Sequence, residues 1–189
     1  GFLPNDQRKL AYQAAHILRS RFHCREGVTI RIKKNIPVAA GLGGGSSDAA
    51  AVLRALNRIW RLGLSQQELA KVALTIDSDV PYCVYSRLAH VTGHGEQIEL
   101  LPDNPHYWVV IAKQQTSVST PQILRQINYE KLEHLDNKRL IACLKAQDWR
   151  NAVKYMGNVL EPVTMQSHPE IRRLKDKMIS LGADVAQMS

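Results

Sequence analysis

The spacing of apolar residues predicts mostly helices in this chain. Apolar positions recur at helical intervals over residues 7–21 and again over residues 46–61. The expected core stripe of the second helix is formed by Leu53, Leu56, Ile59 and Trp60, and Gly63 is its expected C-cap. Ser65 followed by Glu68 has the pattern of a capping box and opens a third helix that runs to about residue 74. Later helices are predicted at 120–126, 137–145, 149–160 and 169–181.

Alternating apolar and polar residues predict strands between these helices. A half-buried strand is expected at 28–33, ended by Pro37, and two strands at 88–92 and 97–101 should form a hairpin through Gly93-His94-Gly95. The remaining segments of this kind are a buried strand at 107–112, a strand or helical turn at 82–85, and a strand at 184–188. The sequence therefore predicts a two-layer α+β protein in two unequal parts, divided near residues 102–105.

Composition is that of a globular protein. Of the 189 residues, 44% are hydrophobic and 22% are charged, and no apolar run approaches the ~20 residues that cross a bilayer. The first residues show no export signal. Cys24, Cys83 and Cys143 are far apart and odd in number, which favours reduced thiols over disulfides or a zinc site. We therefore expect a cytoplasmic protein that does not enter a membrane.

The net charge of +8 and the pI of about 9.6 favour anionic partners. Nucleotides, phosphorylated metabolites and nucleic acid all qualify. The basic residues are spread along the chain, however, and no basic stripe is interleaved with aromatic residues that could stack on bases. Nucleic acid is therefore the least favoured of these partners, although an RNA-binding module remains an alternative.

A glycine-rich stretch precedes the second helix. Residues 41–45 contain four glycines, and Ser46, Ser47 and Asp48 follow where the helix should begin. Free N–H groups at a helix N-terminus attract anions such as phosphate. No lysine follows Gly45, so this is not a Walker A loop, and Ser46 is a poor third glycine for a dinucleotide fingerprint. The structural alternative is a glycine turn capped by Ser46 or Ser47, with Asp48 as an ordinary first-turn residue.

Two carboxylates are candidates for a catalytic base. Asp77 and Asp79 lie two residues apart in Ile-Asp-Ser-Asp-Val-Pro, and the residues alone do not separate them. Phosphoryl transfer needs an acceptor hydroxyl held beside such a group. Either aspartate could instead cap the end of the preceding helix.

The sequence Pro-Val-Ala-Ala-Gly-Leu-Gly-Gly-Gly-Ser-Ser-Asp-Ala-Ala, from Pro37 to Ala50, resembles the phosphate-binding motif of the GHMP small-molecule kinases. The resemblance implies a ribosomal protein S5 domain 2-like N-terminal part and a ferredoxin-like C-terminal part. The two partial domains would span 1–102 and 103–189. It also implies ATP with Mg²⁺ as cofactors and a small substrate linked to cytidine diphosphate, of the kind used in isoprenoid biosynthesis.

The same resemblance assigns roles to individual residues. Asp79, in Ser-Asp-Val-Pro, corresponds to the family's catalytic base, and Thr120 ends a Val-Ser-Thr segment that borders the substrate's cytidine. ATP would be held by Lys34, Pro37, Gly41, Leu42, Gly43, Gly44, Gly45, Ser46 and Ser47. The segment Thr-Gly-His-Gly-Glu from Thr92 to Glu96 resembles a structural turn of the family.

Parts of the family pattern are missing. The family's N-terminal lysine motif and its second glycine loop do not occur, so we expect a piece of a kinase that is inactive in isolation. Lys9, Asp77 and Leu124 stand where the family carries other residues. These departures motivate one alternative, a degenerate relative that binds ATP but has a lost or different substrate.

Overall fold

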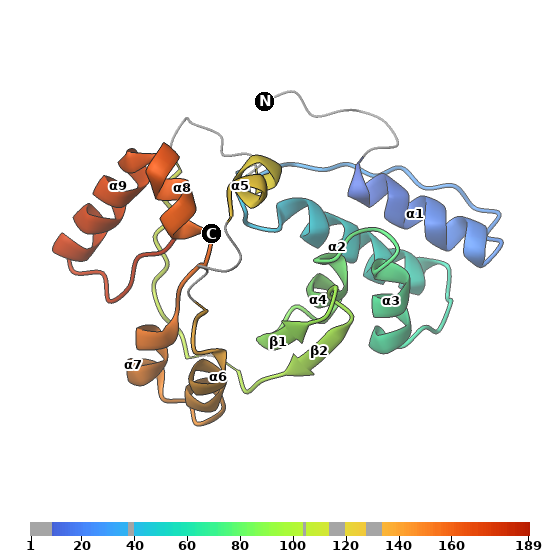
Figure 1. The fold of residues 1–189 in the computed structure, drawn as a ribbon. Helices are drawn as coiled ribbons and strands as arrows, with labels where there is room; N and C mark the ends of the chain where they lie inside the picture. The colour runs from blue at the N-terminus through green and yellow to red at the C-terminus, as the bar shows by residue number, and fades with distance from the viewer. Residues whose placement is uncertain (1–8, 38–39, 104, 114–119, 128–133) are drawn as a thin grey trace. The chain divides into compact units, whose positions relative to one another are not determined.

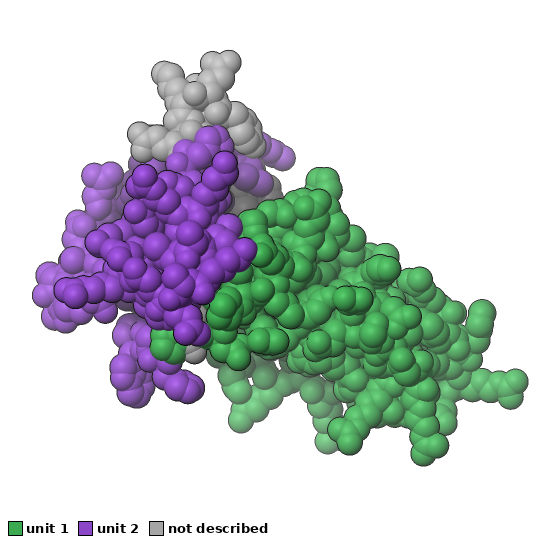
Figure 2. All heavy atoms as spheres, turned by 90° about the horizontal axis from the view of Figure 1, so that it is seen from below, with its two compact units in different colours: residues 1–105 green, residues 106–189 purple. Residues whose placement is uncertain are grey.

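The chain divides into two compact units, residues 1–105 and residues 106–189 (Figure 2). The computed structural model describes residues 9–37, 40–103, 105–113, 120–127 and 134–189. Helices and an antiparallel strand pair both occur among these residues, in agreement with the predicted α+β class. The predicted domain limits at 102 and 103, and the two subdomain folds, stay predictions. In the part of the chain that is described, no helix is long and apolar enough to cross a membrane.

The first unit consists of helices followed by a hairpin (Figure 1). Its elements are α1 (Leu10–Arg21), α2 (Gly44–Ile59), α3 (Gln66–Ala73), α4 (Val80–Tyr85), β1 (Ala89–Thr92) and β2 (Gln97–Leu100). The strands pair antiparallel, with Ala89 opposite Leu100 and Thr92 opposite Gln97. The predicted helices and hairpin are confirmed, and the segment 82–85 is a helical turn.

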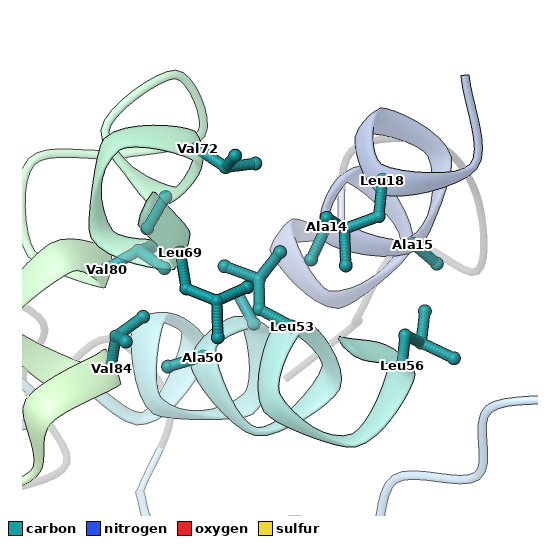
Figure 3. Close-up of a cluster of buried hydrophobic side chains, with 12 residues drawn as sticks. Ala14, Ala15, Leu18, Ala50, Leu53, Leu56, Leu69, Val72, Val80 and Val84 are labelled. Carbon is teal, nitrogen blue, oxygen red and sulfur yellow. The ribbon is translucent and has the colours of Figure 1, made fainter. Parts of the chain in front are cut away.

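Side chains from all four helices form one core in this unit. Leu53 of α2 is fully buried and lies in Figure 3 between residues of α1, such as Ala14, and Leu69 of α3. Val80 and Val84 of α4 complete the cluster on the other side. The apolar stripe of α2 thus packs against α1, α3 and α4 and holds these helices together.

The limits of α2 differ from the prediction. The helix begins at Gly44, its N-cap is Gly43, and its C-cap is Trp60 rather than Gly63. Ile59 was expected in the core stripe but is 59% exposed. It follows Leu53 by six residues, which is about two thirds of a turn beyond a full turn, so the two side chains point in different directions.

The strands predicted at 28–33 and 107–112 are wrong for the residues described. Val28, Ile30 and Ile32 alternate as expected but are 36–39% exposed, and Trp108 is 98% exposed. A strand exists only when a neighbour accepts and donates its ladder hydrogen bonds. Among the described residues the only paired strands are β1 and β2. An apolar pattern indicates which face would be buried, but not whether a partner strand is present.

The second unit contains helices alone among its described residues. They are α5 (Thr120–Gln126), α6 (Asn137–Lys145), α7 (Trp149–Ala152), a 3-10 helix at Val153–Tyr155, α8 (Glu161–Ser167) and α9 (Pro169–Ser180). The predictions for α5, α6 and α9 are confirmed. The single helix predicted at 149–160 is wrong, and so is the strand predicted at 184–188.

Polar side chains explain both errors in the second unit. The backbone leaves helical geometry at Met156, and the Asn158 side chain accepts the Leu160 N–H at 2.9 Å, which favours a turn over a helix. At the end of the chain, the backbone N–H and carbonyl of Met188 bond to side chains rather than to a neighbouring strand. Its N–H donates to Glu161, and its carbonyl accepts from Asn158 at 3.2 Å.

Candidate functional site

The glycine loop, residues 41–47, leads directly into the first turn of α2. Gly43 is the N-cap and has φ +61°, in the left-handed region that favours glycine. No side chain caps this end of the helix, so Ser46 and Ser47 are not caps as one reading of the sequence proposed. The N–H groups of the first turn have no acceptor inside the helix. This end of α2 therefore offers donors to an anion.

Close packing around Gly44 shapes the loop. A Cβ at this position would lie 3.1 Å from Ile36 Cγ2 and 3.6 Å from Lys34 Nζ. The extended segment that carries Lys34 and Ile36 therefore passes over the beginning of α2. Glycine at residue 44 lets this segment approach the helix closely.

An ion pair joins this segment to α2. Lys34 Nζ donates to Asp48 Oδ2 at 2.5 Å, and both side chains are only partly exposed, at 21% and 30%. The pair brings a cation to the helix end, where an anion would bind. From the sequence alone, Asp48 is interpreted as an ordinary first-turn residue. Its pairing with Lys34 was not predicted, because no local pattern links residues fourteen positions apart.

The two serines of the loop have different surroundings. Ser46 is buried, with 6% of its surface exposed, whereas Ser47 is only partly buried. The Ser47 hydroxyl donates to the Gly44 carbonyl at 3.1 Å. Ser47 also lines an open groove of about 340 Å³, together with Arg54, Tyr82, Cys83, Ser86, Arg87 and Leu88. Residues of α2 and α4 therefore meet at this groove.

Arg54 ties α2 to the end of α4. Its guanidinium donates to the carbonyls of Cys83 at 2.7 Å and Val84 at 3.1 Å. Carbonyls at a helix C-terminus lack helical donors, so a cation there stabilises the helix. This contact was not predicted, because it joins residues far apart in the sequence.

The two carboxylates of the aspartate turn, residues 77–79, differ in their hydrogen bonds. Asp77 Oδ1 accepts the backbone N–H of Asp79 at 3.1 Å, so the Asp77 side chain supports the turn. Asp79 is exposed at the N-cap of α4, and its carboxylate makes no capping hydrogen bond. Among the described residues, then, Asp79 is the member of the pair whose carboxylate is not engaged in the turn.

A cysteine lies beside this turn. Burial raises the pKa of the Cys83 thiol, Asp79 and Asp77 raise it further, and Arg54 opposes them. A raised pKa keeps the thiol protonated near neutral pH, which disfavours Cys83 as a nucleophile. No cluster of three metal-ligating side chains occurs in the described ranges.

Three further predicted site residues, Pro37, Leu42 and Thr120, differ in exposure and in the unit to which they belong. Pro37 is exposed, and Leu42 is partly buried. Thr120 is the first residue of α5 in the second unit, and its side chain lies outside the part of the structure that is described. In the first unit, Lys34 lies beside the start of α2, and the packing of α4 on α2 attaches the aspartate turn to the same helix.

Comparison with known proteins gives consistent matches. The family described as GHMP kinases N terminal domain matches residues 9–87, and the one described as GHMP kinases C terminal matches residues 140–189. The 4-diphosphocytidyl-2-C-methyl-D-erythritol kinase of Limosilactobacillus reuteri is 80% identical over all 189 residues, which cover 67% of that protein. The kinase of the same name from Limosilactobacillus fermentum is 70% identical, again over the whole chain and 67% of the relative.

The chain belongs to the GHMP kinase family. It spans about two thirds of the length of these relatives. A crystal structure of 4-(cytidine 5'-diphospho)-2C-methyl-D-erythritol kinase superposes with a TM-score of 0.78 at 30% identity, over 100% of this chain and 68% of that one. The GHMP kinase assignment agrees with the family that the glycine motif predicted.

Most of the predicted site falls within the matched N-terminal GHMP kinase domain. Residues 9–87 include Lys34, the glycine loop and Asp79. Thr120 lies between the two matched segments. The individual roles of these residues stay predictions.

Proposed function

We propose that this protein is an ATP-dependent kinase that phosphorylates the 2-hydroxyl of 4-diphosphocytidyl-2-C-methyl-D-erythritol in isoprenoid precursor biosynthesis. The observation that carries the proposal is the 80% identity, over the whole chain, to a protein named as this kinase. The activity is assigned to the complete protein, because the chain spans 67% of that relative.

The nucleotide is proposed to bind at the start of α2. The N–H groups of the first turn would donate to phosphate oxygens, with the helix dipole adding attraction for negative charge. Lys34 supplies a cation beside Gly44, and Ser46 and Ser47 supply hydroxyls. Gly41, Leu42, Gly43 and Gly45 shape the loop, and Pro37 leads into it. The support for this assignment is the helix end without a side-chain cap.

Asp79 is proposed to accept the proton of the substrate hydroxyl. Its exposed carboxylate and the engagement of Asp77 with the Asp79 N–H favour Asp79 over Asp77. Phosphoryl transfer depends chiefly on held phosphates, neutralised charge and an oriented acceptor. The contribution of Asp79 would be to orient the hydroxyl and remove its proton.

Magnesium is proposed to arrive bound to ATP. Mg²⁺ commonly uses one or two carboxylates together with substrate phosphates. The hydroxyls of Ser46 and Ser47 in the glycine loop are oxygen donors that could approach this ion. Bound Mg²⁺ would neutralise charge that develops on the transferred phosphoryl group.

Two further assignments complete the proposal. Thr120 is proposed to border the cytidine of the substrate. The reaction is proposed to take place in the cytoplasm, which is supported by three free cysteines, Cys24, Cys83 and Cys143.

The decisive test replaces the two aspartates separately in the complete protein. We expect Asp79→Asn to lower turnover with Mg-ATP and the cytidine-linked substrate by ~10²–10⁴-fold, as for loss of a general base. Asp77→Asn is the matched control, because an asparagine Oδ1 can still accept the Asp79 N–H and most of the turnover should remain.

Each other outcome has a definite meaning. If both variants turn over like the wild type, Asp79 is not a base. If the wild type binds ATP but transfers nothing to this substrate, the protein is instead an ATP-binding relative with another substrate.

A further inference from the structure

The turn between β1 and β2, residues 93–96, contacts the aspartate turn through a glycine. Gly95 is buried and has φ +103°, a conformation that residues with a Cβ rarely adopt. A Cβ at residue 95 would lie 2.1 Å from the carbonyl oxygen of Ser78 and 3.0 Å from its carbonyl carbon. The obstacle is backbone, so it cannot rotate away as a side chain could.

The Ser78 carbonyl belongs to the same peptide unit as the Asp79 N–H. Because that unit is planar, a displacement of the oxygen also tilts the N–H. This N–H donates to Asp77 Oδ1 at 3.1 Å, and the Asp77 carbonyl in turn accepts the Val80 N–H at 3.3 Å. The orientation of Asp79 therefore depends on where the Ser78 carbonyl lies.

The hairpin turn is too well braced to move aside instead. Glu96 Oε2 accepts the His94 N–H at 2.6 Å, and the Gly95 N–H donates to the Thr92 carbonyl at 3.3 Å. Hydrogen bonds from the backbone N–H of Glu96 itself and from that of His94 lower the pKa of the Glu96 carboxyl. Pairing of Thr92 with Gln97 anchors the turn to the two strands.

We propose that Gly95 is a positioning residue for Asp79: the absence of a side chain at residue 95 lets the hairpin turn pack on the Ser78 carbonyl and hold the aspartate turn in its reactive orientation. The inference rests on the proposed role of Asp79 as the base. It extends the site to the hairpin, whose turn the sequence predicted only as a structural element.

The test compares alanine at two glycines of the same turn in the complete protein. We expect Gly95→Ala to lower kcat roughly 10²-fold with little change in the KM for ATP, because small misplacements of a catalytic group cost rate. Gly93→Ala is the matched control. Gly93 also has positive φ, at +70°, but the three atoms nearest to its Cβ would all belong to the Glu96 carboxylate. Displacing that carboxylate releases the His94 N–H but leaves the hydrogen bond from Gly95 to Thr92 and the pairing of Thr92 with Gln97 in place.

A double variant separates positioning from general damage. If Gly95 acts through Asp79, adding Gly95→Ala to Asp79→Asn should lower kcat little further, since the group being positioned is already lost. A full additional loss in the double variant would overturn the inference. So would an unchanged kcat in Gly95→Ala, or an equal loss in Gly93→Ala.

Hydrogen exchange provides a readout that does not depend on turnover. The amides of Asp79 and Val80 should exchange faster in Gly95→Ala than in the wild type and in Gly93→Ala, while the α1 amides stay protected. Unaltered exchange at Asp79 and Val80 would overturn the inference. The wild type could show no phosphoryl transfer while Asp79 and Val80 still exchange faster in Gly95→Ala. In that case the contact of Gly95 with the Ser78 carbonyl does hold the aspartate turn, and the proposed function is wrong.

Discussion

At the scale of single residues, the ion pair between Lys34 and Asp48 joins the segment before the glycine loop to α2. In the absence of an anion, Asp48 neutralises the lysine at 2.5 Å. Nucleotide phosphates would compete for the same cation. Lys34 is thus placed to contribute to ATP binding. The ion pair with Asp48 would weaken that contribution, because it must break before Lys34 can bind a phosphate.

We predict that Lys34→Gln weakens ATP binding by roughly 10- to 100-fold, the worth of a hydrogen bond to a charged group. Asp48→Asn is the paired variant, and it should bind ATP at least as tightly as the wild type, since Lys34 is no longer neutralised. Titration calorimetry with ATP measures both. Normal ATP affinity in Lys34→Gln would remove Lys34 from the site.

At the scale of elements, α3 shows how a local signal can define the start of a helix. The Ser65 hydroxyl accepts the Glu68 N–H at 3.2 Å, and the Glu68 carboxylate accepts the Ser65 N–H at 2.8 Å. Both halves of the predicted capping box are therefore present. The motif needs no distant partner, which is why the sequence predicted it correctly.

We predict that Ser65→Ala lowers the free energy of unfolding by about 1 kcal/mol, as for other lost N-caps. The carboxylate adds a dependence on pH. Hydrogen bonds from Ser65 lower the pKa of Glu68 below its ordinary value of 4.5. Its stabilising effect is therefore complete above that value and is lost as the pH falls through the lowered pKa.

Urea unfolding at neutral and acidic pH tests both parts. Glu68→Gln should remove the pH-dependent part and leave the Ser65 hydroxyl as a cap. If Glu68→Gln and the wild type lose stability equally on acidification, Glu68 does not contribute in this way.

At the scale of the whole molecule, the α2 stripe organises the unit of residues 1–105. Leu53 is fully buried, while Ile59 on the same helix is 59% exposed. Removing buried methyl groups costs transfer free energy and leaves a cavity, whereas an exposed side chain costs little. The two residues offer a direct comparison within one helix.

We predict that Leu53→Ala lowers the free energy of unfolding by about 2–5 kcal/mol and that Ile59→Ala changes it by roughly 0.5 kcal/mol or less. Denaturant unfolding of the complete protein measures both. Equal losses in the two variants would mean that the side chain of Ile59 is buried in the complete protein.

Much of the candidate site is predicted from local sequence because its signals are short, and the roles of its residues stay predictions. The glycines and serines of residues 41–47 predicted an anion site at a helix start, and the motif around them predicted the GHMP kinase family. The helix start was misplaced at Ser46. Glycine in a left-handed conformation can serve as the N-cap, so the first helical turn includes the glycines themselves.

The sequence by itself determined the features that depend on neighbours along the chain: the capping box, most helices, the hairpin and the family. Tertiary structure alone decided the features that join distant residues. It paired Lys34 with Asp48, left residues 28–33 without a strand partner among the described residues, and set Gly95 against Ser78. The physical reason is range: caps and turns are satisfied within a few residues, whereas ladders, ion pairs and close backbone contacts require a partner that folding brings from elsewhere.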